Sequence, residues 1–418
     1  MPPVLKQMAD KARLAAYKAF KRMCGGAYSN LLGKEPELSE LDRAFAESIA
    51  LGTLERRITL EYIASPFIKK ETDSDTLYLI LTGLYQAFYM DRVPDSAACD
   101  ETVRIAAALF GRGKSGFVNA VLRGAIRAKD ERLKAVDKAG GYIAASMNPS
   151  LYGMIKRQYP GKAGKICDSL FGKPGIFLRV NTLVSGANEV ALLTGGEPIS
   201  EKTVFCGEAR GAIKHIDSGK YFVQGAGSQR AVEWLCAQSG ETVVDVCAAP
   251  GGKSIGAALD MKNEGKIYSF DIHEKKLRLI ENAAQTMSVK IIETSVNDAR
   301  SAKNELLGKA DRVICDVPCS GTGEMRSKPE IKYKDPREFE GLYKTQRAVI
   351  GAAAQYLKSG GTMVYSTCSI NRYENEEAVA RFIAENPGFA LVREHTSLPC
   401  DAEGEGFYTA EIKREKTI

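Results

Sequence analysis

The chain has 418 residues, of which 44% are hydrophobic and 26% charged, and its formal net charge is +6. Length and composition predict about three globular domains and argue against a disordered, collagen-like or coiled-coil chain. No apolar run approaches the ~18 residues that a membrane helix needs, and residues 1–6 lack the apolar core of a secretory signal. Ten cysteines without a Cys-x-x-Cys pair, and three histidines, predict reduced thiols and no metal site. We therefore expect a cytoplasmic protein that does not bind membranes.

The first 140 residues predict a helical domain with a basic surface. This part is rich in alanine and leucine and fits five or more helices. Residues 1–30 hold six positive charges against one negative charge, and apolar residues recur at helical spacing from Leu5 and Met8 onward. A second basic cluster spans 112–134. A solvated helix face would explain either cluster, but two clusters in one region favour a nucleic-acid partner.

A small mixed module is expected between about 145 and 235. Gly140, Gly141 and Pro149 indicate a linker after the helical region. Strand-like runs follow at 176–180 and 220–223, separated by glycine-rich stretches. This pattern is typical of an α+β module.

From about 236 onward, short apolar runs alternate with helical stretches. Helices are expected at 274–286 and 342–357. The expected strands are 242–246, 266–270, 289–293, 312–315 and 362–365. The alternation predicts an α/β domain with a doubly wound, mostly parallel sheet, which binds ligands beyond the carboxyl ends of its strands.

A glycine-rich turn connects the first of these strands to a helix. It reads Cys247-Ala248-Ala249-Pro250-Gly251-Gly252-Lys253-Ser254. A P-loop would need glycine where Cys247 stands, and the glycines do not fit the G-x-G-x-x-G dinucleotide fingerprint. In the remaining interpretation, small residues let the backbone approach a ligand without phosphates, and the helix N-terminus favours a carboxylate. S-adenosylmethionine has a carboxylate and a ribose but no phosphate, so we expect it as cofactor.

Two acids after the second and third strands fit the same ligand. Asp271 ends the second strand, 20 residues after Gly251, where a carboxylate can accept both ribose hydroxyls. Asp298, after the third strand, is placed to take the adenine amino group. The simpler alternatives are a helix cap for Asp271 and an exposed loop acid for Asp298.

Two cysteines follow the fourth and fifth strands. Cys319 stands in 316–320 and Cys368 in 366–369. Both strand ends should face one crevice, so that two thiols would lie beside the methyl donor. The cysteines that we expect to be buried and inert are Cys24, Cys99, Cys167, Cys206, Cys236 and Cys400.

Methylation of a pyrimidine at carbon 5 is the reaction that needs two thiols beside a methyl donor. Thiolate addition to carbon 6 makes carbon 5 nucleophilic, and a base must later remove the carbon 5 proton. An acid near ring nitrogen 3 must hold the charge that develops. Asp316 is placed for that task, and Lys253 could favour a thiolate.

At these residues the sequence resembles the Nop/Sun family of RNA cytosine carbon-5 methyltransferases. The core segments 245–253, 298–300, 316–320 and 366–369 run in family order, and Gln346, 177–181 and 374–376 also fit. The resemblance implies a Rossmann-like class I methyltransferase sheet. It also implies that Cys368 is the nucleophile and that Cys319 is associated with product release. The implied cofactor-binding residues are Cys247, Ala248, Ala249, Pro250, Gly251, Gly252, Lys253, Asp271, Asp298 and Asp316.

The N-terminal part is similar to the NusB-like helical RNA-binding domain of the bacterial Sun/Fmu (RsmB-type) branch. The similarity rests on 41–46, 51–57, 84–86, 91–95 and 116–123. That branch methylates a cytosine of 16S ribosomal RNA. The implied domains are a NusB-like domain at 1–140, a small RNA-facing, RRM-like module at 145–235, and a methyltransferase domain at 236–418. The residues expected to contact RNA are Lys11, Lys18, Arg22, Arg123, Arg326 and Lys328, with Lys332 and Lys334 beside the last two.

Two short segments depart from the family pattern. The family's Val-Gln-Asp reads Val223-Gln224-Gly225 here, and its Ser-Ser-Gln reads Gly227-Ser228-Gln229. These residues support the wall of the active site in related enzymes. Residues 145–215 match weakly, which bears on the target nucleotide more than on the reaction.

The resulting hypothesis is a monomeric enzyme that methylates carbon 5 of a cytosine in 16S rRNA. The target base must leave its stack, so a loop or an opened helix is the expected substrate. Two alternatives stay open. One is a tRNA cytosine carbon-5 methyltransferase of the same family, and the other is an RNA-binding assembly or antitermination factor with a vestigial methyltransferase fold.

Overall fold

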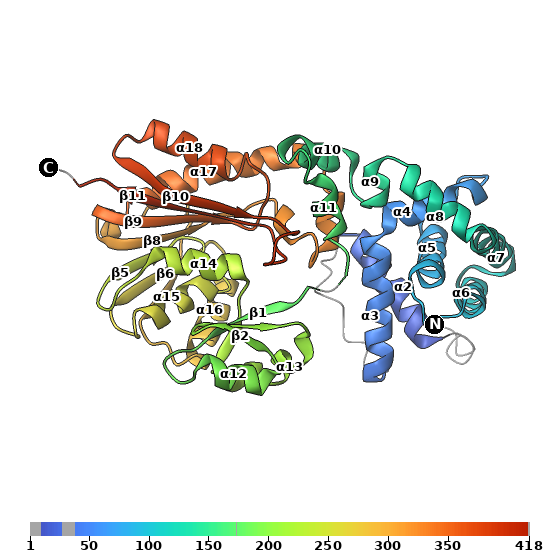
Figure 1. Ribbon diagram of the computed structural model, residues 1–418, viewed down its shortest axis with the longest axis horizontal. Helices are drawn as coiled ribbons and strands as arrows, with labels where there is room; N and C mark the ends of the chain where they lie inside the picture. The colour runs from blue at the N-terminus through green and yellow to red at the C-terminus, as the bar shows by residue number, and fades with distance from the viewer. Residues whose placement is uncertain (1–9, 27–37, 173, 417–418) are drawn as a thin grey trace. The chain divides into compact units, whose positions relative to one another are not determined.

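The computed structural model describes residues 10–26, 38–172 and 174–416. The chain forms two compact units (Figure 1). The first comprises Met1–Phe171 together with Lys328–Asp335, and the second comprises Gly172–Ser327 together with Pro336–Ile418. The predicted three domains, divided near residues 140 and 235, stay a prediction.

The first unit is helical, as the composition of its sequence predicts. Its longer helices before residue 140 are α2 (Lys11–Cys24), α3 (Glu40–Glu55), α4 (Arg57–Ala64), α5 (Ser74–Tyr89), α6 (Asp95–Phe110), α7 (Arg112–Arg127) and α8 (Lys129–Lys138). Carboxylates cap two of them, because Asp10 accepts from the Arg13 N–H at 2.8 Å and Asp73 from the Thr76 N–H at 3.0 Å. The apolar faces of the helices meet in one core. The predicted residues Leu5, Lys6 and Met8 lie outside the described residues.

Residues 140–171 continue the helical unit, so the linker prediction at Pro149 was wrong. Pro149 is the first residue of α10 (Pro149–Gln158), and the Asn148 side chain caps that helix by accepting from the Ser150 N–H at 2.8 Å. Helices α9 (Gly141–Ala144) and α11 (Ala163–Asp168) flank it. A proline after a capping residue starts a helix as readily as it ends one, and the local sequence does not distinguish the two.

The second unit begins with a small antiparallel sheet of strand order β2-β3-β1-β4. Its elements are β1 (Ile176–Val180), α12 (Ala187–Thr194), β2 (Glu197–Ser200), β3 (Thr203–Cys206), α13 (Ala209–Lys214) and β4 (Tyr221–Val223). This β-α-β-β-α-β order is the split βαβ motif. Arg179 of β1 is fully buried, and its Nη2 donates to Asp260 of α15 (Gly252–Asp260) at 2.7 Å. The small sheet is thereby anchored to the helices of the larger one.

The larger sheet has seven strands in the order β10-β11-β9-β8-β5-β6-β7 (Figure 1). They are β5 (Thr242–Asp245), β6 (Lys266–Asp271), β7 (Ile292–Val296), β8 (Ala310–Asp316), β9 (Leu357–Thr367), β10 (Phe389–Ser397) and β11 (Phe407–Arg414). Strands β7, β6, β5, β8 and β9 are parallel, and β11 is antiparallel to both of its neighbours. The predicted doubly wound, mostly parallel sheet is confirmed. Its strand order reverses between β5 and β8, which makes that point the topological switch.

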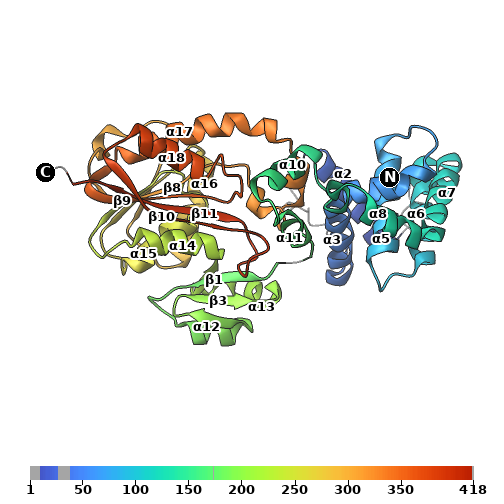
Figure 2. The same cartoon turned by 45° about the horizontal axis from the view of Figure 1, so that its top comes forward.

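Helices cover both faces of this sheet. Helices α14 (Ala226–Leu235) and α15 lie on one face, and α17 (Glu340–Ala354) and α18 (Glu376–Glu385) lie on the other (Figure 1 and Figure 2). Helix α16 (Glu274–Thr286) has the predicted bounds.

Three predicted details of the larger sheet differ from the structure. Strand β7 is Ile292–Val296 rather than 289–293, because Val289 is a buried loop residue whose apolar character resembles that of a strand. Helix α17 ends at Ala354, and Leu357 already begins β9. The β10–β11 hairpin was not predicted, because most of β10 is exposed and its sequence does not alternate between apolar and polar residues. None of the described helices is long and apolar enough to cross a membrane.

Candidate active site

A cavity of about 340 Å³ lies at the carboxyl end of β5, at the switch point of the sheet. Six parts of the second unit line it: the β4–α14 connection, the turn after β5, the ends of β8 and β9, the short helix η5 (Thr322–Glu324), and the segment before β11. The lining residues are Val223, Gln224, Gly225, Ser228, Asp245, Cys247, Ala248, Ala249, Pro250, Gly252, Lys253, Asp316, Glu324, Cys368, Glu405, Gly406 and Phe407.

The glycine-rich turn after β5 brings bare backbone to this cavity. Gly251, just before α15, has a φ of 110°, in the left-handed region that favours glycine. A Cβ at Gly251 would also lie 3.2 Å from the Cα of Ile280 on α16. A larger residue would therefore strain the turn and press against the helix. Most of the predicted cofactor residues of this turn line the cavity, and Gly251 shapes it.

Asp245, the last residue of β5, is a buried acid at the floor of the cavity. Its Oδ2 accepts from the Ser254 hydroxyl at 2.7 Å, whereas its Oδ1 has no hydrogen-bond partner among the described residues. Burial raises the pKa of Asp245 to about 7. Asp245 belongs to the core segment 245–253, but no role was predicted for it. Its position at the end of the first strand, directly before the turn, was the available signal.

Asp271 and Asp298 follow β6 and β7, on the same edge of the sheet as the turn. Asp271 is buried, and its Oδ1 accepts from the His273 N–H at 2.9 Å. The Asn297 N–H donates to the Asp271 carbonyl at 3.2 Å, which joins the two loops. Asp298 is partly buried and holds Arg300 through both carboxylate oxygens, and this contact lowers its pKa to about 2. Neither acid lines the 340 Å³ cavity.

Cys319 and Cys368 meet at the ends of two paired strands. Asp316 of β8 lies opposite Ser366 of β9, and the two cysteines follow these residues with their sulfur atoms 3.3 Å apart. The hydrogen bond with Cys319 and burial raise the pKa of the Cys368 thiol well above its ordinary value. The two cysteines that sequence reasoning singled out therefore lie in direct contact.

Lys253 is paired with Asp316 rather than with a thiolate. Its Nζ lies 2.7 Å from Oδ2 of Asp316, and Oδ1 of that carboxylate accepts from the Ser366 hydroxyl at 2.6 Å. Burial alone would lower the pKa of Lys253, but the charge and hydrogen bond of Asp316, together with the charge of Asp245, outweigh this effect and raise it. In the free protein the charge of Lys253 is paired with that of Asp316, and its role in favouring a thiolate stays a prediction.

The loops that carry the two cysteines are joined by one buried carboxylate. Glu374 accepts from the Ser320 N–H at 2.7 Å on the Cys319 loop and from the Ser369 hydroxyl at 2.6 Å on the Cys368 loop. Gln346 of α17 donates to Glu374 at 3.0 Å and to the Pro318 carbonyl at 2.9 Å. Glu374 and Gln346 fit the family pattern, and in the structure they join the loops that carry the two thiols.

The basic residues predicted to contact RNA differ in exposure. Lys11, Lys18 and Arg22 are exposed on α2, and Arg123 is exposed on α7, where it lies 3.5 Å from Asp100. Arg326 is partly buried and donates to the Gly172 carbonyl at 3.3 Å. Lys328 is also partly buried. Contact with RNA stays a prediction for all six.

Lys332 was expected to hold phosphates, and this expectation was wrong. Its side chain is fully buried within the helical unit, where Nζ donates to the Glu55 carbonyl at 2.8 Å and lies 4.3 Å from the ring centroid of Phe171. Burial lowers the pKa of Lys332 to about 7. The neighbouring Tyr333 is held in the same core through hydrogen bonds with Ser146 and with the Leu54 carbonyl. The segment after the Cys319 loop is therefore a packing element.

Of the cysteines expected to be buried and inert, most are buried or partly buried, but the expectation was wrong for Cys236. Cys99, Cys167 and Cys206 are buried, and Cys24 and Cys400 are partly buried. Cys236 is exposed, because it is the C-cap of α14, where the chain leaves the helix with a φ of 54°. Among the described residues, no cluster of three or more His, Cys, Asp or Glu side chains could hold a metal ion.

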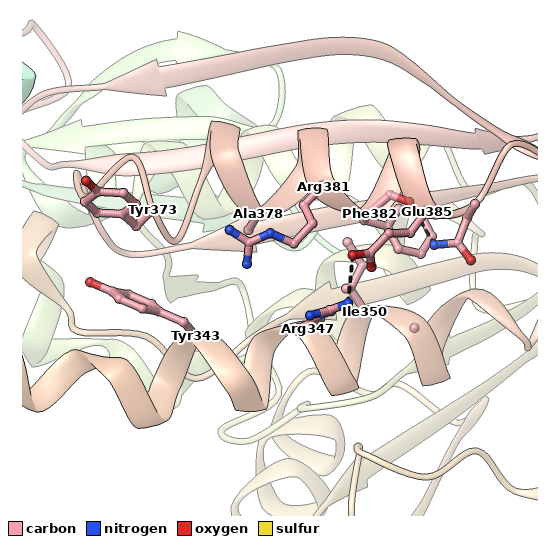
Figure 3. Close-up of a pocket in the computed structure, with 10 residues that line it drawn as sticks. Tyr343, Arg347, Ile350, Tyr373, Ala378, Arg381, Phe382 and Glu385 are labelled. Atoms are coloured by element: carbon pink, nitrogen blue, oxygen red, sulfur yellow. Dashed lines mark hydrogen bonds and ion pairs between the residues drawn. The ribbon is translucent and has the colours of Figure 1, made fainter.

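A second, smaller cavity of about 110 Å³ lies between α17 and α18 (Figure 3). Tyr343 and Tyr373 stand at one end of it, and Arg347 pairs with Glu385 at 2.7 Å near the other (Figure 3). It contains neither thiol and none of the acids described above. Cys368, Asp316 and Lys253 line the larger of these two cavities.

The fold and the 340 Å³ cavity define a class of protein. A seven-stranded sheet with β11 antiparallel to its neighbours, a glycine-rich turn at the switch point and an acid at the end of β6 make the chain a Rossmann-like methyltransferase. S-adenosylmethionine is the cofactor of this class. The residues present fit it, because the turn offers a close approach of bare backbone and Asp245 offers an unpaired buried carboxylate oxygen.

Comparison with known proteins identifies the family. Residues 232–413 match the family described as 16S rRNA methyltransferase RsmB/F, and residues 10–127 match the NusB family. The probable ribosomal RNA small subunit methyltransferase B of Bacillus subtilis (strain 168) is 35% identical over 383 residues, which cover 87% of this chain and 86% of the relative. The ribosomal RNA small subunit methyltransferase B of Yersinia pseudotuberculosis serotype O:1b is 33% identical over 403 residues, covering 90% and 92%. The chain belongs to the RsmB/F methyltransferase family, with a NusB domain at its N-terminal side.

Solved structures support the fold. The crystal structure of PH0851 has a TM-score of 0.78 and 22% identity, and covers 97% of this chain and 98% of its own. The structure of NSun6 from Pyrococcus horikoshii with SFG has a TM-score of 0.58 and 21% identity, covering 65% and 99%.

Proposed function

We propose that the protein transfers a methyl group from S-adenosylmethionine to carbon 5 of a cytosine in 16S rRNA, through a covalent bond between Cys368 and carbon 6. The observation that carries the proposal is the 3.3 Å approach of the Cys319 and Cys368 sulfurs beside the cofactor-type cavity. The curated relatives are ribosomal RNA small subunit methyltransferases, which supports rRNA as the substrate. The exposed basic residues of α2 support an RNA partner.

The cofactor would be held at the turn after β5. The turn backbone, Asp271 and Asp298 are the proposed contacts, and the unpaired Oδ1 of Asp245 could accept from an ammonium group at the cavity floor. When bound, S-adenosylmethionine supplies an electrophilic methyl group. Gly252 lines the cavity without a side chain, and Gly251 lets the turn pack against α16.

The chain's own residues would prepare the base in two stages. Cys368 adds to carbon 6 as a thiolate, which raises the electron density at carbon 5. Asp316 is the proposed acid beside ring nitrogen 3, where charge develops, and Lys253 and Ser366 hold its carboxylate in place. After methyl transfer a base takes the carbon 5 proton, a role that we propose for the Cys319 thiolate. The electrons of that C–H bond re-form the double bond between carbons 5 and 6, the bond between Cys368 and carbon 6 breaks, and its electron pair returns to sulfur. Cys319, in contact with that sulfur, is placed to assist this last step.

The raised pKa of Cys368 predicts the pH profile of the reaction. Because the thiolate is the reactive form and the free thiol holds its proton well above its ordinary pKa, kcat/KM should rise about tenfold per pH unit from pH 7 to pH 9. Initial rates of methyl transfer from radiolabelled S-adenosylmethionine would measure it. Cofactor affinity determined at each pH is the control. A plateau below pH 8 would show that the thiolate already exists in the free enzyme.

The target can be found by bisulfite sequencing of total RNA from cells with and without the gene. We expect one cytosine of 16S rRNA to lose its protection from deamination when the gene is absent, and to regain it when purified protein and S-adenosylmethionine are added. Loss of protection in a tRNA instead would favour the tRNA enzyme. If no cytosine changes and calorimetry detects no binding of S-adenosylmethionine, the protein is an RNA-binding factor.

A further inference from the structure

Two glycines at the start of α14 leave room for another part of the chain. Gly225 is the N-cap of this helix and offers no side chain to its first turn. Gly227 follows two residues later. Both face the segment before β11, because a Cβ at Gly225 would lie 2.3 Å from Oε2 of Glu405, and a Cβ at Gly227 would lie 2.4 Å from Cβ of Phe407. A side chain at Gly225 would displace the Glu405 carboxylate, and a side chain at Gly227 would press against Phe407.

Glu405 supplies the capping group that Gly225 lacks. Its Oε1 accepts from the Gly227 N–H at 2.8 Å, and a negative charge at a helix N-terminus is favourable. An aspartate at an N-cap normally accepts from this same N–H group, two residues into the helix. The backbone of Gly225, with φ −59° and ψ 154°, has the extended conformation that an N-cap aspartate adopts. The Glu405 carboxylate therefore occupies the place that an aspartate at 225 would fill.

The departures from the family pattern coincide with this arrangement. The family's aspartate and serine stand where Gly225 and Gly227 stand here, and the structure places Glu405 and Phe407 in the space of their side chains. We propose that Glu405 is a positioning residue for the active site, which caps α14 in place of the missing aspartate. Its effect on methyl transfer rests on the proposed function, whereas its capping role does not.

The segment that carries Glu405 is also hydrogen-bonded to the loops of the two thiols. The Gly406 N–H donates to the Gly323 carbonyl at 3.0 Å, and the Gly323 N–H donates to the Cys368 carbonyl at 2.9 Å. A Cβ at Gly323 would lie 1.8 Å from the Gly406 carbonyl oxygen, so the two segments are in close contact. The bond between Glu405 and α14 therefore ties the cavity wall to the loops of both reactive cysteines.

A double-mutant cycle on the full-length protein tests the proposal. Glu405→Ala should lower the melting temperature by about 2–4 °C, because the helix loses its cap. It should also lower kcat for methyl transfer to a 16S rRNA transcript by about 10-fold or more, because the thiols are no longer held in place, with little change in S-adenosylmethionine affinity. Gly225→Asp alone should be equally harmful, since two carboxylates would compete for one space. The combination of Gly225→Asp with Glu405→Ala should restore both measurements.

Glu403→Ala is the matched control, because this neighbouring carboxylate pairs with Arg230 further along α14. Gly225→Asp should not rescue it. If Glu405→Ala does not fold, Glu405→Gln replaces it, because glutamine keeps an oxygen acceptor. Glu405→Gln should lower the melting temperature and kcat less than Glu405→Ala does, and adding Gly225→Asp should lower both further. Additive losses in the double variant would overturn the proposal. If the wild-type protein methylates no RNA, the proposed function fails, while the melting temperatures still decide the role of Glu405.

Discussion

Replacing Cys368 with serine should abolish methyl transfer to RNA and any covalent protein–RNA complex. A serine hydroxyl is far less acidic than a thiol, so it cannot add to carbon 6 at neutral pH. Removal of a catalytic nucleophile typically costs a factor on the order of 10⁴ or more in kcat. Transfer of label from radiolabelled S-adenosylmethionine to a 16S rRNA transcript would measure the rate. Denaturing gels would show whether an adduct forms.

Binding measurements separate this chemical role from misfolding. Cys368→Ser removes no packed group larger than sulfur, so S-adenosylmethionine affinity and melting temperature should stay close to those of the wild type. The exposed Cys236 offers a matched control, because Cys236→Ser should leave methyl transfer unchanged. If Cys368→Ser still forms an adduct whereas Cys319→Ser does not, the roles of the two cysteines are reversed.

Local patterns in the sequence were sufficient for most of the fold. Helix α16 has the predicted bounds, because its apolar positions recur at helical spacing and its flanks are polar. Strands β5 and β6 are short apolar runs between polar residues, which the structure confirms. The errors arise where burial depends on distant residues. Val289 resembles a strand residue because the core covers a loop there, and Pro149 resembles a break although Asn148 caps a helix.

The site shows the same division between residue types and their environment. The motifs predicted Cys319, Cys368 and Asp316 at neighbouring strand ends, because parallel strands bring their carboxyl ends to one edge. They did not predict that Glu374 joins the two thiol loops or that Glu405 caps α14, since both contacts join segments far apart in the chain. The prediction that Lys332 binds phosphate was wrong for the same reason. A lysine in a basic stretch resembles a surface residue until the core that buries it is known.

Replacing Cys319 with serine should have the opposite effect on the adduct. Cys368 would still add to carbon 6 and the methyl group would still be transferred, but the bond to sulfur would persist without the thiol that assists its release. We expect a stable protein–RNA complex on denaturing gels, formed with an unmodified 16S rRNA transcript and S-adenosylmethionine. Turnover should fall by a factor on the order of 10² to 10⁴, the usual contribution of a proton-transfer group.

This complex accumulates only if Cys368 adds to carbon 6 before Cys319 assists the release. The loops of Cys319 and Cys368 share the Glu374 carboxylate, so a serine at 319 should keep its place and leave Cys368 in position. The double variant Cys319→Ser with Cys368→Ser should then form no complex. If the double variant still forms a complex, the covalent bond lies on another residue. If Cys319→Ser releases its product rapidly, a group other than Cys319 assists the release. Glu324 and Glu405 are the other acids to test, because both line the cavity.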